Sequence, residues 1–216
     1  MSKYFKDNST MLFQGDSVTD CGRNRDKTAT TDDIYGSGYP YIFKKLYDKA
    51  FPDNTVKFIN RGVSGNRICD LLDRYDEDFK SECPDYISVL IGINDTWRAF
   101  DNGDYTSPEK FHKEYETLLK KLKSDFPNAK IIILEQFAIL SNPLRSDWND
   151  DLEPKRAVTR ELAAKYADVF IPLYDMINEA TSNQMTGEEF SQDGVHPETK
   201  GHEFIANALM KALGIF

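Results

Sequence analysis

Cysteine is scarce in this sequence, and its scarcity excludes two kinds of cross-linked architecture. Only three cysteines occur among 216 residues, at positions 21, 69 and 83. An odd number of widely spaced cysteines indicates neither a disulfide framework nor a zinc knuckle. A chain of this length can bury a hydrophobic core without such cross-links. Because no repeat, low-complexity linker or break in composition divides the chain, we expect residues 1–216 to form one domain.

Long apolar runs are also missing. No stretch approaches the ~20 apolar residues that a membrane-spanning helix needs. The N-terminus is polar, and its first apolar run, residues 11–13, is too short for the apolar region of a signal peptide. We therefore expect a soluble cytoplasmic protein.

Positive charge is in deficit, with 27 Lys and Arg against 36 Asp and Glu and a net charge of −9. Binding to phosphate backbones or anionic lipids depends mainly on clustered Lys and Arg. We therefore expect neither nucleic acid nor a membrane as a partner, while a homo-oligomer stays open.

Short apolar segments alternate with helical patterns along the whole chain. Segments rich in β-branched or aromatic residues predict buried strands at 10–14, 55–60, 86–92, 130–136 and 168–172. Apolar residues at helical spacing predict helices at 41–50, 111–122, 156–167 and 202–213. This alternation indicates an α/β fold in which helices cover a parallel sheet.

In such folds, ligands bind beyond the carboxyl ends of the strands. The loops to search begin near residues 15, 61, 92 and 137, and a long polar loop is expected at 182–195. Four of these regions contain residue types that could form a catalytic site.

The first two regions follow the first two strands. Residues 15–20 read Gly-Asp-Ser-Val-Thr-Asp, which places Ser17 at the start of a helix with its hydroxyl facing the cleft. The alternative is that Asp16 or Ser17 only caps that helix. Residues 60–66 read Asn-Arg-Gly-Val-Ser-Gly-Asn, where Gly65 is placed to donate a backbone N–H. The alternative there is an ordinary turn with Asn66 as a helix cap.

The other two regions supply an amide and a base. Asn94 follows the third strand and is a neutral donor suited to an oxyanion, although Asn-Asp at this place is also typical of an Asx turn. Asp193 and His196 lie three residues apart across a glycine, so the carboxylate can meet one ring nitrogen while the other faces the cleft. A surface cap or half of a metal site are the alternatives, but no third His or Cys lies at ligand spacing.

The coincidence of the four regions favours an active site. One cleft would gather a nucleophile, a base, an orienting acid and oxyanion donors. Capping or turn roles would have to explain each region separately.

These four segments resemble the blocks of the SGNH (GDSL) hydrolase superfamily, which is named for a Ser, a Gly, an Asn and a His. The resemblance runs from residue 15 to residue 196 and implies a three-layer α/β/α sandwich with a five-stranded parallel sheet, the flavodoxin-like SGNH fold. It implies Ser17 as nucleophile, the Ser17 and Gly65 N–H groups with Asn94 as oxyanion donors, and Asp193 and His196 as the rest of the triad. Such a mechanism requires no cofactor and no metal.

In detail, residues 15–23, 62–66, 91–98 and 195–197 look like those of the intracellular bacterial acetylxylan esterases of this superfamily. The implied activity is deacetylation of xylo-oligosaccharides. The alternatives are a thioesterase or lysophospholipase with the same triad, and a catalytically silent carbohydrate-binding protein. The α/β-hydrolase elbow G-x-S-x-G is absent.

Several neighbouring residues have two interpretations. Trp97 and Arg98 are expected in a loop beside the acyl pocket, where they would bind substrate. The alternative for Trp97 is packing in the core. Arg23 and Arg25 are expected to pair with acids. His112 is expected to be solvated and His202 to pack or cap, whereas Asp16, Asp20 and Asp95 are expected in turns and caps.

Overall fold

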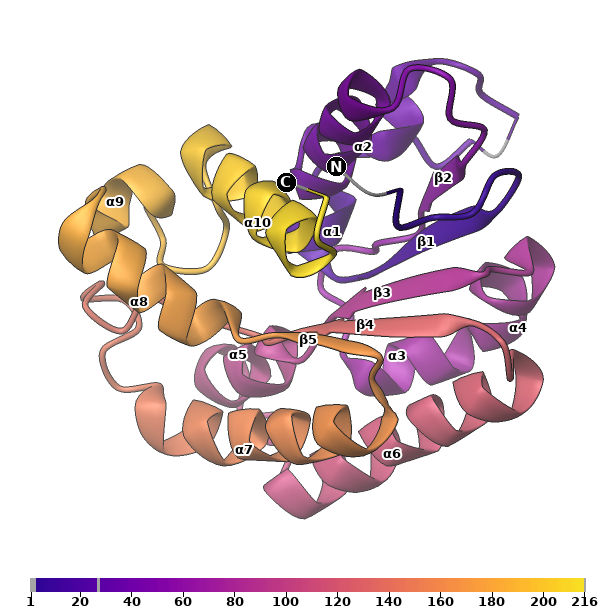
Figure 1. Ribbon diagram of the computed structural model, residues 1–216. Helices are drawn as coiled ribbons and strands as arrows, with labels where there is room; N and C mark the ends of the chain where they lie inside the picture. Colours follow the sequence, from indigo (N-terminus) through magenta and orange to yellow (C-terminus); the bar gives the residue numbers. More distant parts are fainter. Residues whose placement is uncertain (1–2, 27, 216) are drawn as a thin grey trace.

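A parallel sheet of five strands forms the middle layer of the protein, in the order β2-β1-β3-β4-β5 (Figure 1). The computed structural model describes residues 3–26 and 28–215. The strands are β1 (Thr10–Gly15), β2 (Lys57–Asn60), β3 (Tyr86–Leu90), β4 (Lys130–Leu134) and β5 (Val169–Ile171). The predicted fold class, an α/β sandwich around five parallel strands, is confirmed.

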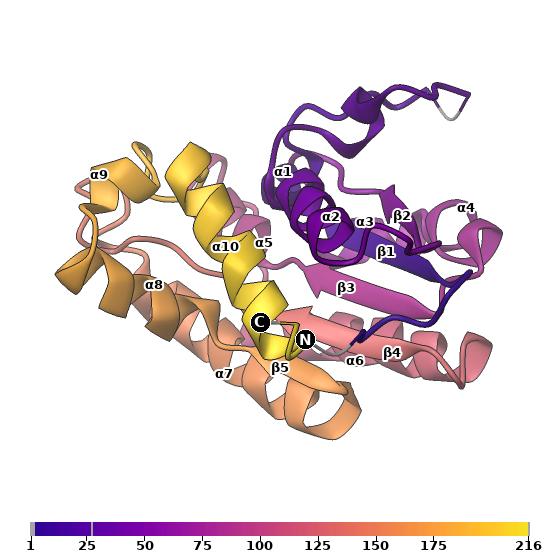
Figure 2. The ribbon, with the colours of Figure 1, turned by 45° about the horizontal axis from the view of Figure 1, so that its top comes forward.

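Helices cover both faces of the sheet (Figures 1 and 2). One layer contains α1 (Ser17–Asp20), α2 (Tyr39–Ala50), α8 (Leu173–Asn183), α9 (Gly187–Phe190) and α10 (Thr199–Ala212). The other contains α3 (Ile68–Asp73), α4 (Tyr75–Asp78), α6 (Pro108–Asp125) and α7 (Asn149–Tyr166). The helix α5 (Ile93–Asp101) follows β3 directly, and the 3-10 helices η1 (Asp32–Tyr35) and η2 (Lys80–Glu82) lie in connections.

The alternation of side chains along each strand explains the two layers. In β1, Met11 and Phe13 belong to the core beneath α2 and α10, whereas Leu12 belongs to the core on the α6 face. All three side chains are essentially inaccessible to solvent. A strand that is covered on both faces needs apolar residues at successive positions, which is the pattern that the sequence shows.

The sheet order creates the cleft. The chain passes from β1 to β2 on one side of β1 and returns to β3 on the other side. Ligands in open α/β sheets bind where the order reverses in this way, above the carboxyl ends of the two central strands. The loops after β1 and β3 carry Ser17 and Asn94, respectively.

The predicted strands and helices are present, but several bounds differ. The strand β2 begins at Lys57 rather than at residue 55, because the Asn54 side chain accepts a hydrogen bond from the Val56 N–H and forms a turn. The strand β3 ends at Leu90 because Gly92, at φ 119°, starts α5. A Cβ at Gly92 would lie 3.0 Å from the Phe111 ring, so glycine alone fits there.

The expectation of a long polar loop at 182–195 is wrong in part. The helix α8 continues to Asn183, and α9 occupies residues 187–190. Thr186 and Glu189 form a capping box that starts α9, which is a local signal in the sequence. None of the helices that the structure describes combines the length and apolar composition that crossing a bilayer requires.

Candidate active site

Ser17 is the first residue of α1, directly after β1. Asp16 caps this helix, because its carboxylate accepts a hydrogen bond from the Val18 N–H at 3.0 Å. The cap role expected for Asp16 is thus confirmed. The Asp16 side chain is almost completely buried, and this burial raises its pKa to about 7. The Ser17 N–H donates to no acceptor among the described residues, whereas the N–H groups of Thr19 and Asp20 donate to the Asp16 carbonyl.

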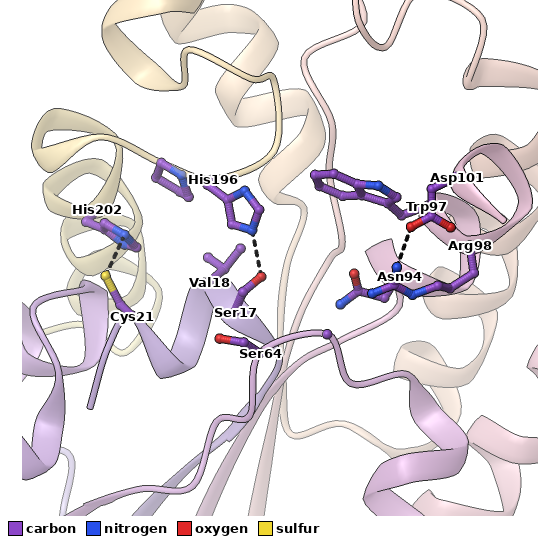
Figure 3. Close-up of a pocket in the computed structure, with 12 residues that line it drawn as sticks. Ser17, Val18, Cys21, Ser64, Asn94, Trp97, Arg98, Asp101, His196 and His202 are labelled. Carbon is purple, nitrogen blue, oxygen red and sulfur yellow. Dashed lines mark hydrogen bonds and ion pairs between the residues drawn. The ribbon is translucent and has the colours of Figure 1, made fainter. Parts of the chain in front are cut away.

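The Ser17 hydroxyl meets His196, which lies 179 residues later in the chain. Ser17 Oγ is 2.8 Å from His196 Nε2, and Figure 3 shows the two side chains facing each other. On the other side of the ring, His196 Nδ1 is 2.7 Å from Asp193 Oδ2. The structure therefore brings Ser17, His196 and Asp193 into one hydrogen-bonded chain.

The hydrogen bonds between Asp193 and His196 change the acidity of both residues. Burial works to raise the pKa of Asp193, but hydrogen bonds from the His196 ring and from the backbone N–H groups of His196 and Val195 outweigh it and hold the pKa well below its usual range. The hydrogen bond to Asp193 raises the pKa of His196, against the effect of burial. Asp193 thus stays ionised and stabilises a protonated His196 ring.

Two further donors face the same pocket. Gly65 has φ 83°, in the left-handed region that favours glycine, and its N–H donates to no acceptor among the described residues. Asn94 Nδ2 donates to the Asn66 carbonyl at 3.0 Å. Because an amide nitrogen carries two hydrogens, the second N–H of Asn94 is left for another acceptor. Together with the Ser17 N–H, these groups suit a developing oxyanion.

A pocket of about 520 Å³ joins these groups. Its lining includes Ser17, Gly65, Asn94 and His196, together with Val18, Cys21, Ser64, Trp97, Arg98, Asp101, Pro197 and His202. Within the described part of the chain, no three His, Cys, Asp or Glu side chains gather to hold a metal ion.

Comparison with known proteins agrees with this geometry. The model of the GDSL-like lipase/acylhydrolase family matches residues 13–204. The chain belongs to this family. It is 31% identical over 206 residues to an acetylxylan esterase of Geobacillus stearothermophilus, covering 94% of this chain and 93% of that enzyme. The chain is thus a carboxylic ester hydrolase.

Solved structures extend the similarity to the fold. A protein from Parabacteroides merdae assigned to the GDSL-like lipases superposes with a TM-score of 0.92 at 32% identity, covering 98% of both chains. A variant of an acetyl xylan esterase from Geobacillus stearothermophilus superposes with a TM-score of 0.89 at 27% identity, covering 99% of this chain and 98% of that one. Catalytic mutants of the Geobacillus enzyme, in which a serine, an aspartate or a histidine is replaced by alanine, also match.

In this hydrolase, Trp97 and Arg98 line the pocket from α5, so their predicted placement in a loop is wrong. The turn expected after the third strand is a helix because Gly92 allows the chain to turn directly into it. The Trp97 ring lies 5.5 Å from the His196 ring, and Arg145 packs over its face. Arg98 pairs with Asp101.

The remaining charged residues near the hydrolase pocket hold its loops together. Asp20 is the last residue of α1 and accepts hydrogen bonds from the Ser64 N–H at 3.0 Å and the Arg25 guanidinium at 2.6 Å. The expected pairing of Arg25 with an acid is therefore present. Arg23 donates to the Gly62 carbonyl at 2.8 Å and is 3.9 Å from Asp20. The expectation that Asp95 is a turn or cap residue is wrong, because it is fully buried within the first turn of α5, whose N-cap is Gly92. Burial there raises the pKa of Asp95 to about 7.

The other two histidines have different surroundings. His112 is partly exposed and lies 3.3 Å from Glu161. His202 is buried, and its Nδ1 accepts a hydrogen bond from the Tyr39 N–H while Nε2 is 3.3 Å from Cys21 Sγ. His202 therefore packs as expected.

Sequence reasoning missed six residues that line the pocket, namely Val18, Cys21, Ser64, Asp101, Pro197 and His202. Asn94, Trp97 and Asp101 are spaced so that they share one face of a helix. A prediction of α5 as a helix would therefore have placed Asp101 beside the pocket. Cys21 and His202 come together only through the packing of α1 against α10, for which the sequence holds no local signal.

Proposed function

We propose that this hydrolase is a serine esterase that removes acetyl groups from xylo-oligosaccharides. Ser17 is the nucleophile, His196 the general base and Asp193 the residue that orients the base. The observation that carries the proposal is the 2.8 Å contact between Ser17 Oγ and His196 Nε2 at the wall of the pocket. The similarity to an acetylxylan esterase over 94% of the chain supports the choice of substrate.

In the first half of the reaction, Ser17 Oγ attacks the ester carbonyl carbon and its proton passes to His196 Nε2. The carbonyl oxygen becomes an oxyanion, which the N–H groups of Ser17 and Gly65 and the amide of Asn94 stabilise. His196 then returns the proton to the sugar oxygen as the carbon–oxygen bond breaks. The products of this half are the free sugar hydroxyl and an acetylated Ser17.

The second half repeats these roles with water as the nucleophile. His196 takes a proton from the water as its oxygen attacks the acyl carbon, and the same donors hold the second oxyanion. The bond to Ser17 Oγ then breaks, and His196 returns the proton to Ser17. Acetate leaves and the free enzyme is restored.

Three residues of the pocket suit a carbohydrate. The Trp97 indole offers an apolar face beside His196, and an aromatic face of this kind packs against the apolar face of a sugar ring. Arg98 and Asp101 form an ion pair on the same helix and offer donors and acceptors for hydroxyl groups. We propose Trp97 and Arg98 as substrate-binding residues.

A panel of acyl chain lengths on one leaving group tests the proposal, measured beside acetylated xylose and acetylated glucose. We expect kcat/KM to fall steeply from acetyl to octanoyl, with acetylated xylo-oligosaccharides among the good substrates. Equal rates from acetyl to octanoyl would contradict the deacetylase assignment and favour a thioesterase or lysophospholipase.

A second experiment tests the nucleophile alone. An organophosphonate probe should label Ser17 in the native protein and leave Ser17→Ala unlabelled. Absence of an adduct on the folded native protein would contradict the triad and favour a catalytically silent binding protein.

A further inference from the structure

Arg74 holds together the segments that carry the three oxyanion donors, although it does not line the pocket. It lies between α3 and α4, and its side chain is only 15% exposed. We propose that Arg74 is a positioning residue for the oxyanion site. This inference rests on the proposed function, because it assumes that Ser17, Gly65 and Asn94 stabilise an oxyanion.

The guanidinium of Arg74 donates to three acceptors in two segments, the end of β1 and the turn between β2 and α3. Its Nε donates to Asn66 Oδ1 at 2.7 Å, its Nη1 to the Arg61 carbonyl at 2.8 Å and its Nη2 to the Gly15 carbonyl at 3.3 Å. Nη1 also pairs with Asp78, whose carboxylate offsets the cost of burying the positive charge. All three nitrogens of the planar guanidinium therefore donate hydrogen bonds.

Each of these acceptors lies within four residues of an oxyanion donor along the chain. Gly15 ends β1 two residues before Ser17. Arg61 and Asn66 flank the turn that contains Gly65, so Arg74 holds that turn from both ends.

The link to Asn94 passes through Asn66. The carbonyl of Asn66 accepts the hydrogen bond from Asn94 Nδ2 at 3.0 Å, while its side chain accepts the bond from Arg74. The position of Asn66 therefore decides where the second N–H of Asn94 points. Among the residues that the structure describes, Arg74 forms no hydrogen bond with Ser17 or His196, so it does not bear on the base.

A lysine at position 74 would keep the charge opposite Asp78 but would lose the fork that reaches several acceptors. Small displacements of catalytic groups are costly, so we expect Arg74→Lys to lower kcat by about 10- to 100-fold. KM should change little, because the residue does not line the pocket. The acid limb of the pH profile of kcat/KM should keep its position, because His196 is untouched.

Arg61→Lys is the matched control. The Arg61 side chain is 15% exposed, like that of Arg74. It pairs with Glu82 of η2 and lies 3.9 Å from Asp78, while only its backbone carbonyl accepts a hydrogen bond from Arg74. This variant changes an arginine to a lysine in the same region but leaves the proposed framework intact. We expect its kcat to stay within about twofold of the native value, because the hydrogen bonds of Arg74 to Asn66, Arg61 and Gly15 all remain and no oxyanion donor is displaced.

A double-mutant cycle with Asn94→Ala separates positioning from a general effect on folding. If Arg74 acts through the oxyanion donors, its replacement should cost less kcat in the Asn94→Ala background than in the native one. Losses that multiply, with the same factor for Arg74→Lys in both backgrounds, would overturn the inference and leave the proposed function standing. A negligible effect of Asn94→Ala alone would instead overturn the oxyanion role in the proposed function.

Circular dichroism shows whether Arg74→Lys folds. If it does not, Asn66→Ala tests the same positioning role. This substitution removes the acceptor of Arg74 Nε but keeps the carbonyl that binds Asn94. We expect a smaller fall in kcat, again reduced in the Asn94→Ala background. Native kcat in Asn66→Ala would overturn the inference.

Discussion

The carboxylate of Asp193 holds His196 at two points. Oδ2 lies 2.7 Å from Nδ1 of the ring, and Oδ1 accepts a hydrogen bond from the His196 backbone N–H at 2.8 Å. Ring and backbone are therefore fixed by one side chain, which leaves Nε2 facing Ser17 at 2.8 Å. This pair is the basis of the first two predictions.

Ser17→Ala should abolish ester turnover without unfolding the protein. The side chain is small, and within the described part of the chain its hydroxyl forms a hydrogen bond with His196 alone. We expect kcat to fall by about 10⁴-fold or more, as for other serine nucleophiles. Hydrolysis of a chromogenic acetate ester and thermal unfolding measure the two effects. A folded variant with near-native rates would remove the mechanism.

The pH dependence should report His196. The ring accepts a proton only when it is neutral, and the hydrogen bond to Asp193 raises its pKa above the ordinary 6.5. The acid limb of kcat/KM should therefore lie above pH 6.5. Asp193→Asn removes the carboxylate, so the limb should move to lower pH while kcat falls by about 10⁴-fold. A profile that is flat between pH 5 and 8 would contradict the assignment of His196 as the base.

Asn94→Ala should lower kcat by about 10²- to 10³-fold, the usual cost of removing one oxyanion donor. The substitution also removes the hydrogen bond to the Asn66 carbonyl, so stability must be measured beside activity. KM should stay close to the native value because the donor acts mainly on the transition state. A loss of only a few-fold would reduce Asn94 to a structural role.

Gly65→Ala should cost both stability and activity. Its φ of 83° is strained for alanine, and a Cβ would lie 3.4 Å from Arg98 Nη2. We expect a loss of about 1 to 3 kcal/mol in the free energy of unfolding and a marked fall in kcat as the N–H shifts. Gly103→Ala is the control, because Gly103 has a similar φ of 74° but lies in an open loop. It should lose stability without losing activity, and equal kcat losses in both variants would refute the role of the Gly65 N–H.

His202 should make the protein less stable in mild acid. Burial lowers its pKa from the ordinary 6.5 to about 4. Between these two values the unfolded chain binds more protons than the folded one, so the free energy of unfolding rises with pH across this window. Its stabilising effect is complete above about pH 6.5 and is lost as the pH falls toward 4. Urea unfolding at pH 7 and at pH 5 measures this effect. In His202→Gln, the free energy of unfolding should differ less between the two pH values than in the native protein. An unchanged difference would show that His202 is not the cause of the pH dependence.

The candidate site was largely predictable because its chemistry is local. Asp193 and His196 meet across one turn, and Ser17 follows a glycine at the end of β1. Such motifs depend on a few neighbouring backbone angles, which the residue types themselves favour. The alternation of strands and helices was predictable for the same reason, since periodicity is set by which faces must be buried.

The helix α5 shows where local reasoning fails. Its nine residues carry several polar side chains, but Ile93, Trp97 and Phe100 recur at helical spacing, and Ile93 and Trp97 belong to one apolar cluster with Trp148 and Leu152. Trp97 contacts His196 because α5 and the loop before α10 lie at the same end of the sheet. The helix could have been predicted from that spacing, whereas its contact with His196 is not encoded within a short window of sequence.

The sequence by itself determined the fold class, the residues at the strand ends and the pairing of Asp193 with His196. Only the tertiary structure decided which distant residues share the pocket and which buried side chain holds its loops. Cys21 meets His202, and Arg74 reaches Gly15, across 181 and 59 residues respectively. The physical reason is that strand order and helix packing minimise exposed apolar surface over the whole chain, so contacts between distant segments follow from the assembled core rather than from local patterns.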